Sequence, residues 1–270
     1  MREFLRKNGC EFYHDTQIVD FVSDANSIKG VVTEHDQTFL SDNVVLATGH
    51  SAEDVFHSLE KHGVMMEAKS YALGLRIEHP QAAINKIQYR DHFAHPKLGS
   101  ANYKLTYHDH DSNTGVYSFC MCPGGFILSS GTEIDGLVCN GMSNFNRNSQ
   151  WANSAIVVTI EAGKDTSKDF WGGMKLRRDI ETKAFKSVQA AGGTKQLPAQ
   201  KITDFIKNKA GATIPGSSPS GVVGVNLQTL LPKKVNQFLL KGLENFDTKM
   251  KGFVIDQAQF YGVETRTNRK

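Results

Sequence analysis

The chain has 270 residues, of which 39% are hydrophobic and 22% charged, so its length and composition are those of an ordinary globular protein. The formal net charge is +3, and the Lys and Arg residues are spread along the chain. They form no basic stripe of the kind typical of a nucleic-acid-binding protein, so we expect no nucleic-acid partner. No apolar run approaches the roughly 18 residues of a membrane span, and no secretory leader precedes the charged start. We therefore expect no membrane contact and a cytoplasmic protein with reduced thiols.

Short strand-like segments alternate with turns in the first 63 residues. Their pattern predicts a three-strand polar meander formed by residues 16–23, 28–34 and 37–40. The run 43–47 is apolar after its first residue, which is typical of a strand covered on both faces. This predicted strand ends in Thr48-Gly49, and a helix is expected to begin close to Ser51.

The region from about residue 64 to residue 160 is predicted to be rich in strands, and the part that follows to be more helical. Apolar residues recur every four positions between 174 and 191, which predicts an amphipathic helix. A second helix is expected to start at Pro232. Residues 210–224 are rich in Gly, Ser and Pro and are predicted to form a loop, and a last strand is expected at 258–267.

The most informative local motif is Ala47-Thr48-Gly49, which ends the predicted strand directly after the meander. Flavoproteins with two dinucleotide-binding domains carry this arrangement, in which the glycine lets the backbone approach the cofactor closely. Taken alone, the same residues also suit an ordinary turn between a strand and a helix. The motif therefore favours a flavoprotein only together with longer matches.

Such matches occur at residues 46–52, 63–64, 74–81, 117–125, 140–143 and 263–267. The string at 118–125, Ser-Phe-Cys-Met-Cys-Pro-Gly-Gly, is unusual enough to be specific. With these strings in this order over nearly its whole length, the chain resembles the uncharacterised FAD-dependent dehydrogenases of bacteria and archaea, a group of NAD(P)/FAD-dependent oxidoreductases.

The resemblance implies an α/β (mixed α+β) architecture, in which a partial flavoprotein FAD/NAD(P)-binding fold carries an inserted strand-and-helix substrate domain. Residues 1–63 would form the partial FAD-binding domain with its meander, residues 64–253 the inserted substrate domain, and residues 254–270 a return strand. FAD would carry out the hydride chemistry on a small-molecule substrate of unknown identity, and NAD(P)H is a candidate electron donor.

The same resemblance places particular residues beside the cofactor or the substrate. FAD would be contacted by Thr48, Gly49, His50 and Ser51. The candidates for the flavin or substrate pocket are Cys120, Cys122, Gly124, Gly125, Asn140, Gly141 and Arg147. No catalytic base and no metal ligand is assigned.

Three charged or titratable residues near the start of the inserted domain allow a functional or a structural interpretation. Arg76, like Arg147, is a candidate for holding an anionic group and is equally consistent with a surface residue. Glu78 and His79 are adjacent in a predicted strand, so their side chains should face opposite sides of the sheet. This alternation argues against a proton-transfer pair.

Two segments that the family carries are not found in this sequence. Family members begin with a G-x-G-x-x-G turn, whose amides and helix dipole hold the FAD pyrophosphate, and they end with another glycine-rich turn near the flavin. We therefore expect an internal fragment that is inactive by itself. Its apolar strand would lack neighbours, which predicts weak stability or self-association through an exposed sheet edge.

Cys120 and Cys122 leave three interpretations open. They fit two small residues of a strand and turn, or a redox thiol whose pKa is lowered by nearby positive charge. They also fit metal ligands completed by histidines such as His108 or His110, although C-x-C spacing is weak evidence for zinc. A metal-binding protein is thus one alternative to the oxidoreductase. Another is a non-catalytic assembly partner of a separately encoded FAD-binding half.

Overall fold

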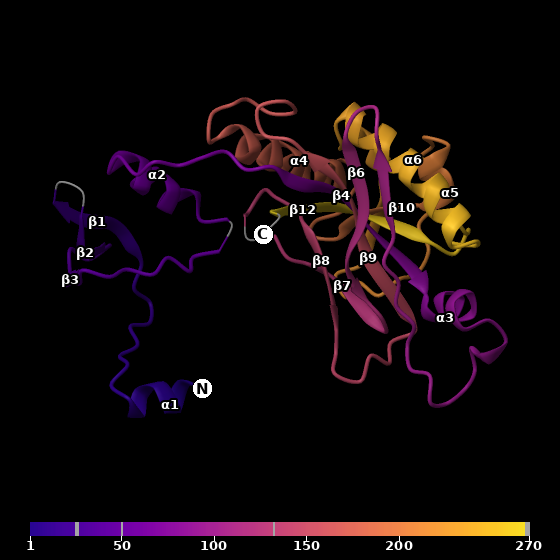
Figure 1. The fold of residues 1–270 in the computed structure, drawn as a ribbon, viewed down its shortest axis with the longest axis horizontal. Helices are drawn as coiled ribbons and strands as arrows, with labels where there is room; N and C mark the ends of the chain where they lie inside the picture. The colour runs from indigo at the N-terminus through magenta and orange to yellow at the C-terminus, as the bar shows by residue number, and fades with distance from the viewer. Residues whose placement is uncertain (25–26, 50, 132, 268–270) are drawn as a thin grey trace. The chain divides into compact units, whose positions relative to one another are not determined.

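The computed structural model describes residues 1–24, 27–49, 51–131 and 133–267 and divides the chain into two compact units (Figure 1). Unit 1 comprises Met1–Glu67, and unit 2 comprises Ala68–Lys270. Helices and mixed sheets together confirm the predicted α/β (mixed) class. In the described parts of the chain, every helix is too short or too polar to cross a membrane.

An antiparallel meander and a helix form the centre of unit 1. The strands are β1 (Ile18–Asp24), β2 (Ser27–Thr33) and β3 (Thr38–Leu40), paired in that order. The short helix α1 (Arg2–Lys7) precedes them, and α2 (Glu53–Lys61) packs against β1. The predicted three-strand meander is therefore confirmed.

The predicted strand at 43–47 is wrong. These residues adopt no regular structure, and Val45 and Leu46 are 89% and 47% exposed. A strand forms only when its N–H and C=O groups pair with a neighbouring strand, and no strand in the described part of the chain pairs with this segment. Apolar composition alone does not supply that partner.

Unit 2 is built on a seven-stranded sheet of order β11-β10-β12-β4-β9-β6-β5. Neighbouring strands are antiparallel, except that β10 and β11 are parallel. The strands are β4 (Tyr71–Pro80), β5 (Thr106–Asp109), β6 (Thr114–Cys122), β9 (Trp151–Ile160), β10 (Leu197–Lys201), β11 (Val222–Gly224) and β12 (Gln259–Thr267). A separate antiparallel pair, β7 (Gly125–Ser129) and β8 (Cys139–Ser143), contacts β4, β9 and β12 through β8.

The helices of unit 2 cover one face of this sheet. They are α3 (Gln81–Tyr89), α4 (Gly172–Ala190), α5 (Ile202–Ile206) and α6 (Lys233–Lys249), with the short 3-10 turns η1 (Arg90–His92) and η2 (Leu227–Thr229). In Figure 1, α4 and α6 lie together along one side of the unit, away from β7 and β8. The predicted helices at 174–191 and after Pro232 are confirmed as α4 and α6.

The two faces of β4 have different partners because successive side chains of a strand point to opposite sides. Leu73, Leu75 and Ile77 are fully buried in the main core with residues of α4 and α6. The alternate positions, Arg76 and Glu78, point to the second face, where β8 lies. The central strand therefore carries an apolar core on one side and a buried polar cluster on the other.

The grouping of residues 1–63, 64–253 and 254–270 into parts of an FAD-binding domain and an inserted domain stays a prediction. In the structure, β12 lies between β10 and β4 in the large sheet of unit 2. Residues 210–221 form the predicted loop, and the last residues of the predicted 210–224 segment pair with β10 as β11.

Candidate functional site

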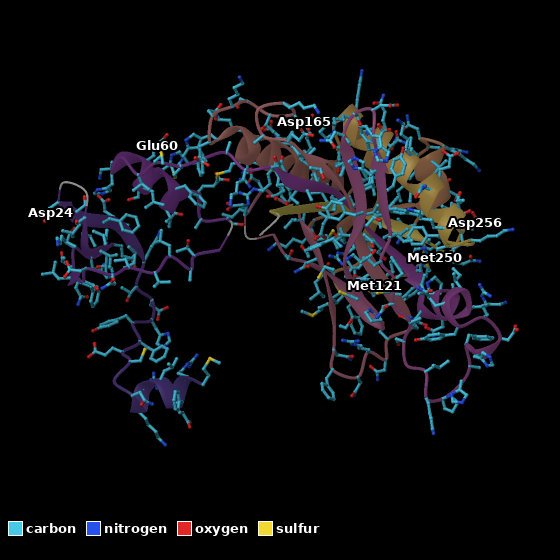
Figure 2. All side chains as sticks on the ribbon, viewed as in Figure 1. Asp24, Glu60, Met121, Asp165, Met250 and Asp256 are labelled. Atoms are coloured by element: carbon cyan, nitrogen blue, oxygen red, sulfur yellow. The ribbon has the colours of Figure 1, made fainter. Side chains whose placement is uncertain are left out.

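A β-bulge interrupts β6 at Cys120, inside the most specific string of the sequence. Phe119 pairs with Ala155 of β9 and Cys122 pairs with Asn153, so Cys120 and Met121 (labelled in Figure 2) together oppose a single residue. Cys120 has a φ of 49°, in the left-handed region that few residues other than glycine adopt. Its side chain is exposed.

The bulge changes which face of the sheet the following residue occupies. Before it, Val116 and Ser118 pair with core residues of β9 and are buried on the helix-covered side. After it, Cys122 stands opposite Asn153, whose side chain contacts Arg76 on the second face. One extra residue thus directs Cys122 toward the polar cluster, a known use of bulges near functional sites.

Arg76 is the centre of this cluster and is fully buried. Its Nε and Nη2 donate to the two carboxylate oxygens of Glu264 at 3.0 and 3.2 Å. Its Nη1 donates to Asn153 Oδ1 at 2.8 Å and to the carbonyl oxygen of Cys120 at 3.3 Å. Burial alone lowers the pKa of Arg76, and the Glu264 carboxylate more than offsets this, so the pKa lies above its ordinary value.

The pairing with Glu264 corrects one interpretation drawn from the sequence. Arg76 was a candidate for holding an anionic substrate or phosphate, but both the charge and the fork of the guanidinium are used inside the protein. Arg147, the other candidate, is exposed, with its carbonyl accepting a hydrogen bond from Ser100 Oγ at 2.7 Å. Its role in binding an anion stays a prediction.

Three glycines let the turn at 120–125, β8 and the Arg147 segment touch. A Cβ added at Gly141 would lie 2.1 Å from Asn153 Oδ1 and 2.2 Å from Arg76 Nη1. A Cβ at Gly124 would lie 1.8 Å from the carbonyl oxygen of Arg147, and one at Gly125 would lie 2.5 Å from that of Met142. These contacts have no room for a side chain. They pack the turn against the Arg147 segment and β8, and they pack β8 against Arg76 and Asn153.

The structure therefore brings together all seven residues predicted for the pocket on unit 2. Their environments differ: Cys120 and Arg147 are exposed, Asn140 is half-buried, and the others are buried. Burial raises the pKa of the Cys122 thiol, and the positive charge of Arg76 opposes this only in part. The conditions for a reactive thiolate are thus not met at Cys122. Whether these residues contact flavin or substrate stays a prediction.

Sequence reasoning missed three partners of this cluster. Glu264 and Asn153 hold Arg76, and the Cys139 thiol lies 3.8 Å from Glu264 Oε2. Arg76 and Glu264 are 188 positions apart, so no local pattern links them. The pairing of β4 with β12, which brings them together, is a tertiary feature.

A second buried group lies next to this cluster on the same face of the sheet. The Glu78 carboxylate accepts hydrogen bonds from the Tyr261 hydroxyl at 2.5 Å and from the Ser217 amide at 3.1 Å, and the Ser217 hydroxyl also donates to it. Gln259 exchanges hydrogen bonds with both backbone groups of Ile214 at 3.0 and 3.2 Å. The loop at 210–221 is therefore fastened to the sheet at two points. Burial raises the pKa of Glu78, although the donors of Ser217 and Tyr261 oppose it.

His79 lies on the opposite face from Glu78, as the alternation predicts. The ring is fully buried, and its Nε2 donates to the carbonyl oxygen of Phe253 at 2.7 Å. Burial lowers the pKa of His79 from 6.5 to about 4. Glu78 and His79 therefore form no proton-transfer pair.

The residues predicted to contact FAD lie in unit 1, in the irregular segment before α2. Thr48 and Gly49 are exposed, and Gly49 has a φ of +84° with nothing within 4 Å of the position a Cβ would take. Ser51 is half-buried, and its carbonyl oxygen accepts a hydrogen bond from the Glu53 amide at 2.9 Å. His50 lies outside the residues that the structure describes.

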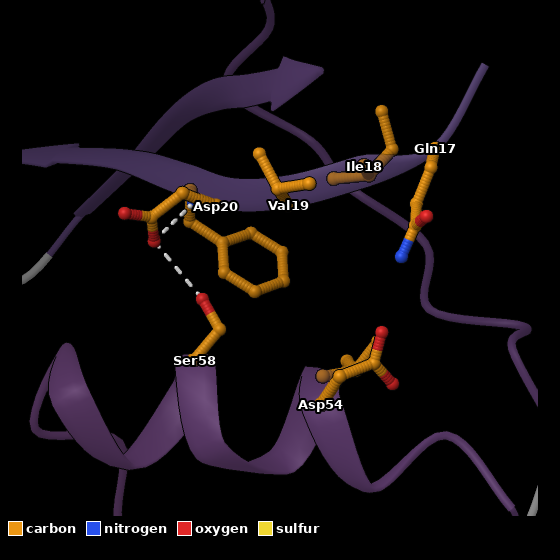
Figure 3. Close-up of a pocket in the computed structure, with 8 residues that line it drawn as sticks. Gln17, Ile18, Val19, Asp20, Asp54 and Ser58 are labelled. Carbon is orange, nitrogen blue, oxygen red and sulfur yellow. Dashed lines mark hydrogen bonds between the residues drawn. The ribbon is translucent and has the colours of Figure 1, made fainter. Parts of the chain in front are cut away.

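A pocket of about 140 Å³ lies between β1 and α2 (Figure 3). It is lined by Gln17, Ile18, Val19, Asp20, Phe21, Asp54, Val55 and Ser58. Asp20 accepts hydrogen bonds from Lys61 Nζ at 2.6 Å, His62 Nε2 at 2.7 Å and Ser58 Oγ at 2.9 Å. Lys61 above all, with His62, holds the pKa of Asp20 well below its usual range. Asp20 therefore ties α2 to the meander.

Metal ligation finds no support in the described ranges, where no group of three or more His, Cys, Asp and Glu side chains is placed to hold an ion. His108 belongs to β5 and His110 to the turn that follows it, and the centroids of their rings lie 4.8 Å apart. Cys122 is directed toward Arg76. The alternative of a metal-binding protein thus gains nothing from the structure.

Comparison with known protein families shows to which family the chain belongs. The model of the family described as FAD-dependent protein, C-terminal domain-like, matches residues 70–267. The chain belongs to this family. The match covers the strands of unit 2 from β4 to β12, and with them the Arg76 cluster and the turn at 120–125. Thr48 and Gly49 lie before the matched range.

Two known proteins resemble this member of the FAD-dependent protein C-terminal domain-like family. An uncharacterised protein of Clostridium beijerinckii is 37% identical over 276 residues, which cover 99% of this chain and 50% of the relative. A D-amino acid dehydrogenase of Helicobacter pylori is 29% identical over 77 residues, which cover 28% of this chain and 18% of that protein. The chain thus spans at most about half the length of these curated relatives.

Proposed function

We propose that the chain is part of an FAD-dependent oxidoreductase and that the turn at 120–125, with β8, forms the flavin-facing wall of its substrate pocket. The family match over residues 70–267 carries this proposal, because that range builds the wall. The partial likeness to a D-amino acid dehydrogenase supports the same reaction class. A bound flavin would supply the hydride chemistry. The substrate and the use of NAD(P)H as electron donor remain predictions.

In unit 1, Gly49 leaves room for FAD to approach, but the acidic start of α2 limits which part of FAD can bind there. The open space around Gly49 leaves its backbone accessible, and the exposed Thr48 offers an uncharged hydroxyl. The first turn of α2 carries Glu53 and Asp54, whose charges disfavour a diphosphate at this helix N-terminus. We therefore propose that Thr48, Gly49 and Ser51 contact an uncharged part of FAD.

The protein's own contribution in unit 2 is a fixed shape. The buried Arg76–Glu264 pair has no net charge, and it holds the carbonyl of Cys120 from inside. Gly125 lets the turn pack against β8, Gly124 lets it pack against the Arg147 segment, and Gly141 lets β8 pack against Arg76. A wall held this way can orient a ring or a substrate without reorganising, which is what positioning requires.

Flavin retention tests the proposal directly. The purified chain is incubated with excess FAD and desalted, and its visible absorption spectrum is then recorded. The segment that holds the FAD pyrophosphate in the family is not found in this sequence, so the first question is whether flavin absorbance remains with the protein. Where it remains, we expect Gly49→Val to abolish it, because a Val side chain fills the open approach to the backbone. Gly9→Val is the matched control, since Gly9 has a φ of +83° and equally open surroundings in the same unit. Equal flavin retention by Gly49→Val and the wild type would contradict the placement of Gly49 beside FAD. A colourless wild-type chain would confine the proposed oxidoreductase function to a protein that supplies the remaining FAD contacts.

A second candidate function is that of an assembly partner for a separately encoded FAD-binding half. It is favoured by the exposed apolar residues Val45 and Leu46, which belong to a segment without a strand partner among the described residues. The same segment supports the proposal of self-association. A colourless protein that forms concentration-dependent oligomers in sedimentation would favour this function.

A further inference from the structure

The turn at 120–125 contains a backbone conformation that needs support. Cys120 is in the left-handed region, which is strained for a residue with a Cβ and persists only where the surroundings enforce it. Its carbonyl oxygen accepts two hydrogen bonds, from Arg76 Nη1 and from the Cys122 thiol, each at 3.3 Å. A charged donor makes the stronger of two such bonds.

We propose that Arg76 is a positioning residue, which enforces the bulge in β6 and thereby presents Cys120 on the surface of the turn at 120–125. The functional meaning of this role rests on the proposal that the turn faces the flavin. Arg76 acts through the Cys120 carbonyl and has no contact with a substrate in this role. Its charge is neutralised by Glu264, so it is not offered as an anion site.

The register of β6 shows what the bulge changes. Val116 and Ser118 are buried on the helix-covered face, and in a regular strand Cys120 would follow them to that side. The extra residue breaks the alternation, leaves Cys120 exposed and turns Cys122 to the second face. Removing the tie to the carbonyl should let β6 return to regular pairing, which buries the Cys120 side chain.

The surroundings of Arg76 suit a fixed support. Two hydrogen bonds to Glu264 and one to Asn153 hold the guanidinium, and Gly141 packs directly against it. A lysine at this position would keep the ion pair, but its single ammonium group cannot serve Glu264, Asn153 and the Cys120 carbonyl in the same planar fork. Arg76→Lys therefore keeps the positive charge beside Glu264 but removes the hydrogen bond that positions the Cys120 carbonyl.

The test is the rate at which Cys120 reacts with a small maleimide in the folded 270-residue chain. Cys10→Ser is introduced throughout, because Cys10 is also exposed whereas Cys122 and Cys139 are buried. In this background Arg76→Lys should slow the labelling of Cys120 by about tenfold or more, because thiol reactivity follows exposure. Arg177→Lys is the matched control, a buried arginine of α4, and should leave the rate within about twofold.

The direction of the change separates positioning from mere stability. If Arg76 only stabilised unit 2, its replacement would loosen the fold, speed the labelling and allow Cys122 and Cys139 to react as well. A second variant, Arg76→Met with Glu264→Met, removes both charges together and so avoids an unpaired buried charge. It should slow the labelling of Cys120 as Arg76→Lys does.

Each outcome decides the inference. An unchanged or faster rate in both folded Arg76 variants overturns it, and failure of both variants to fold shows that Arg76 maintains the whole unit, which also overturns it. Flavin retention is recorded on the same samples. Slower labelling of Cys120 in the Arg76 variants, together with a wild-type chain that stays colourless with FAD, supports the positioning role and counts against FAD binding by this chain. Flavin retained by the wild-type chain, together with an unaltered labelling rate in the Arg76 variants, supports the proposed function and contradicts the positioning role.

Discussion

Replacing Arg76 by methionine is expected to lower the free energy of unfolding of unit 2 by about 3–5 kcal/mol, because it leaves the buried Glu264 carboxylate without its partner. Both side chains are completely buried, so water cannot take the place of the lost guanidinium. Urea denaturation followed by tryptophan fluorescence measures the loss, since Trp151 and Trp171 both lie in unit 2.

The double variant Arg76→Met with Glu264→Met is expected to recover most of that loss, because two apolar side chains replace a pair whose desolvation was costly. Arg178→Met is the control for a partly exposed pair. The side chains of Arg178 and Asp135 are 30% and 52% exposed, so solvent screens their interaction, and its loss should cost about 1 kcal/mol or less. Equal destabilisation by the single and the double variant would contradict an uncompensated charge as the cause.

Lowering the pH from 6.5 to about 4 is expected to remove about 3 kcal/mol of stability through His79 alone, at 1.36 kcal/mol per pKa unit. Burial holds the folded-state pKa of His79 at about 4, below the ordinary 6.5. Between these values the unfolded chain binds a proton that the folded chain does not, so stability falls as the pH falls. Above pH 6.5 the contribution is constant.

The variant His79→Gln isolates this effect, since glutamine can donate to the Phe253 carbonyl and does not titrate. The wild-type unfolding free energy minus that of the variant should decrease as the pH falls from 6.5 to about 4. Taking the difference removes the contribution of Glu78, whose raised pKa makes stability fall as the pH rises above its ordinary value of 4.5. His92→Gln, at an exposed histidine, is the matched control for the substitution itself. Parallel profiles for wild type and His79→Gln would contradict this assignment.

The elements that local sequence predicted correctly are those whose pattern is complete within one segment. Apolar residues every four positions specify one face of a helix, and α4 follows that spacing. The meander follows from short runs divided by polar turns. The strand predicted at 43–47 is wrong for the converse reason, because a strand depends on neighbours that the segment itself does not contain.

In the candidate site too, the local strings were predictable from the sequence, whereas the contacts between distant residues were not. The strings at 118–125 and 140–143 were singled out from the sequence, and the structure places them in contact. The burial of Arg76 was not foreseen, because it depends on Glu264, 188 positions away, and on the pairing of β4 with β12. The turning of Cys122 toward Arg76 was not foreseen either, because a single bulge reverses the alternation on which sequence patterns rely.

Protection of Cys120 by FAD tests most directly whether the turn at 120–125 faces the flavin. In the Cys10→Ser chain, FAD at about 100 times its Kd should slow maleimide labelling of Cys120 by at least about tenfold, because bound ligand leaves only a small free fraction. Adenosine diphosphate at the same concentration should protect less, since it lacks the flavin ring. Labelling of Cys120 at the unprotected rate, in samples whose spectrum shows bound flavin, would contradict the placement of this turn beside the cofactor.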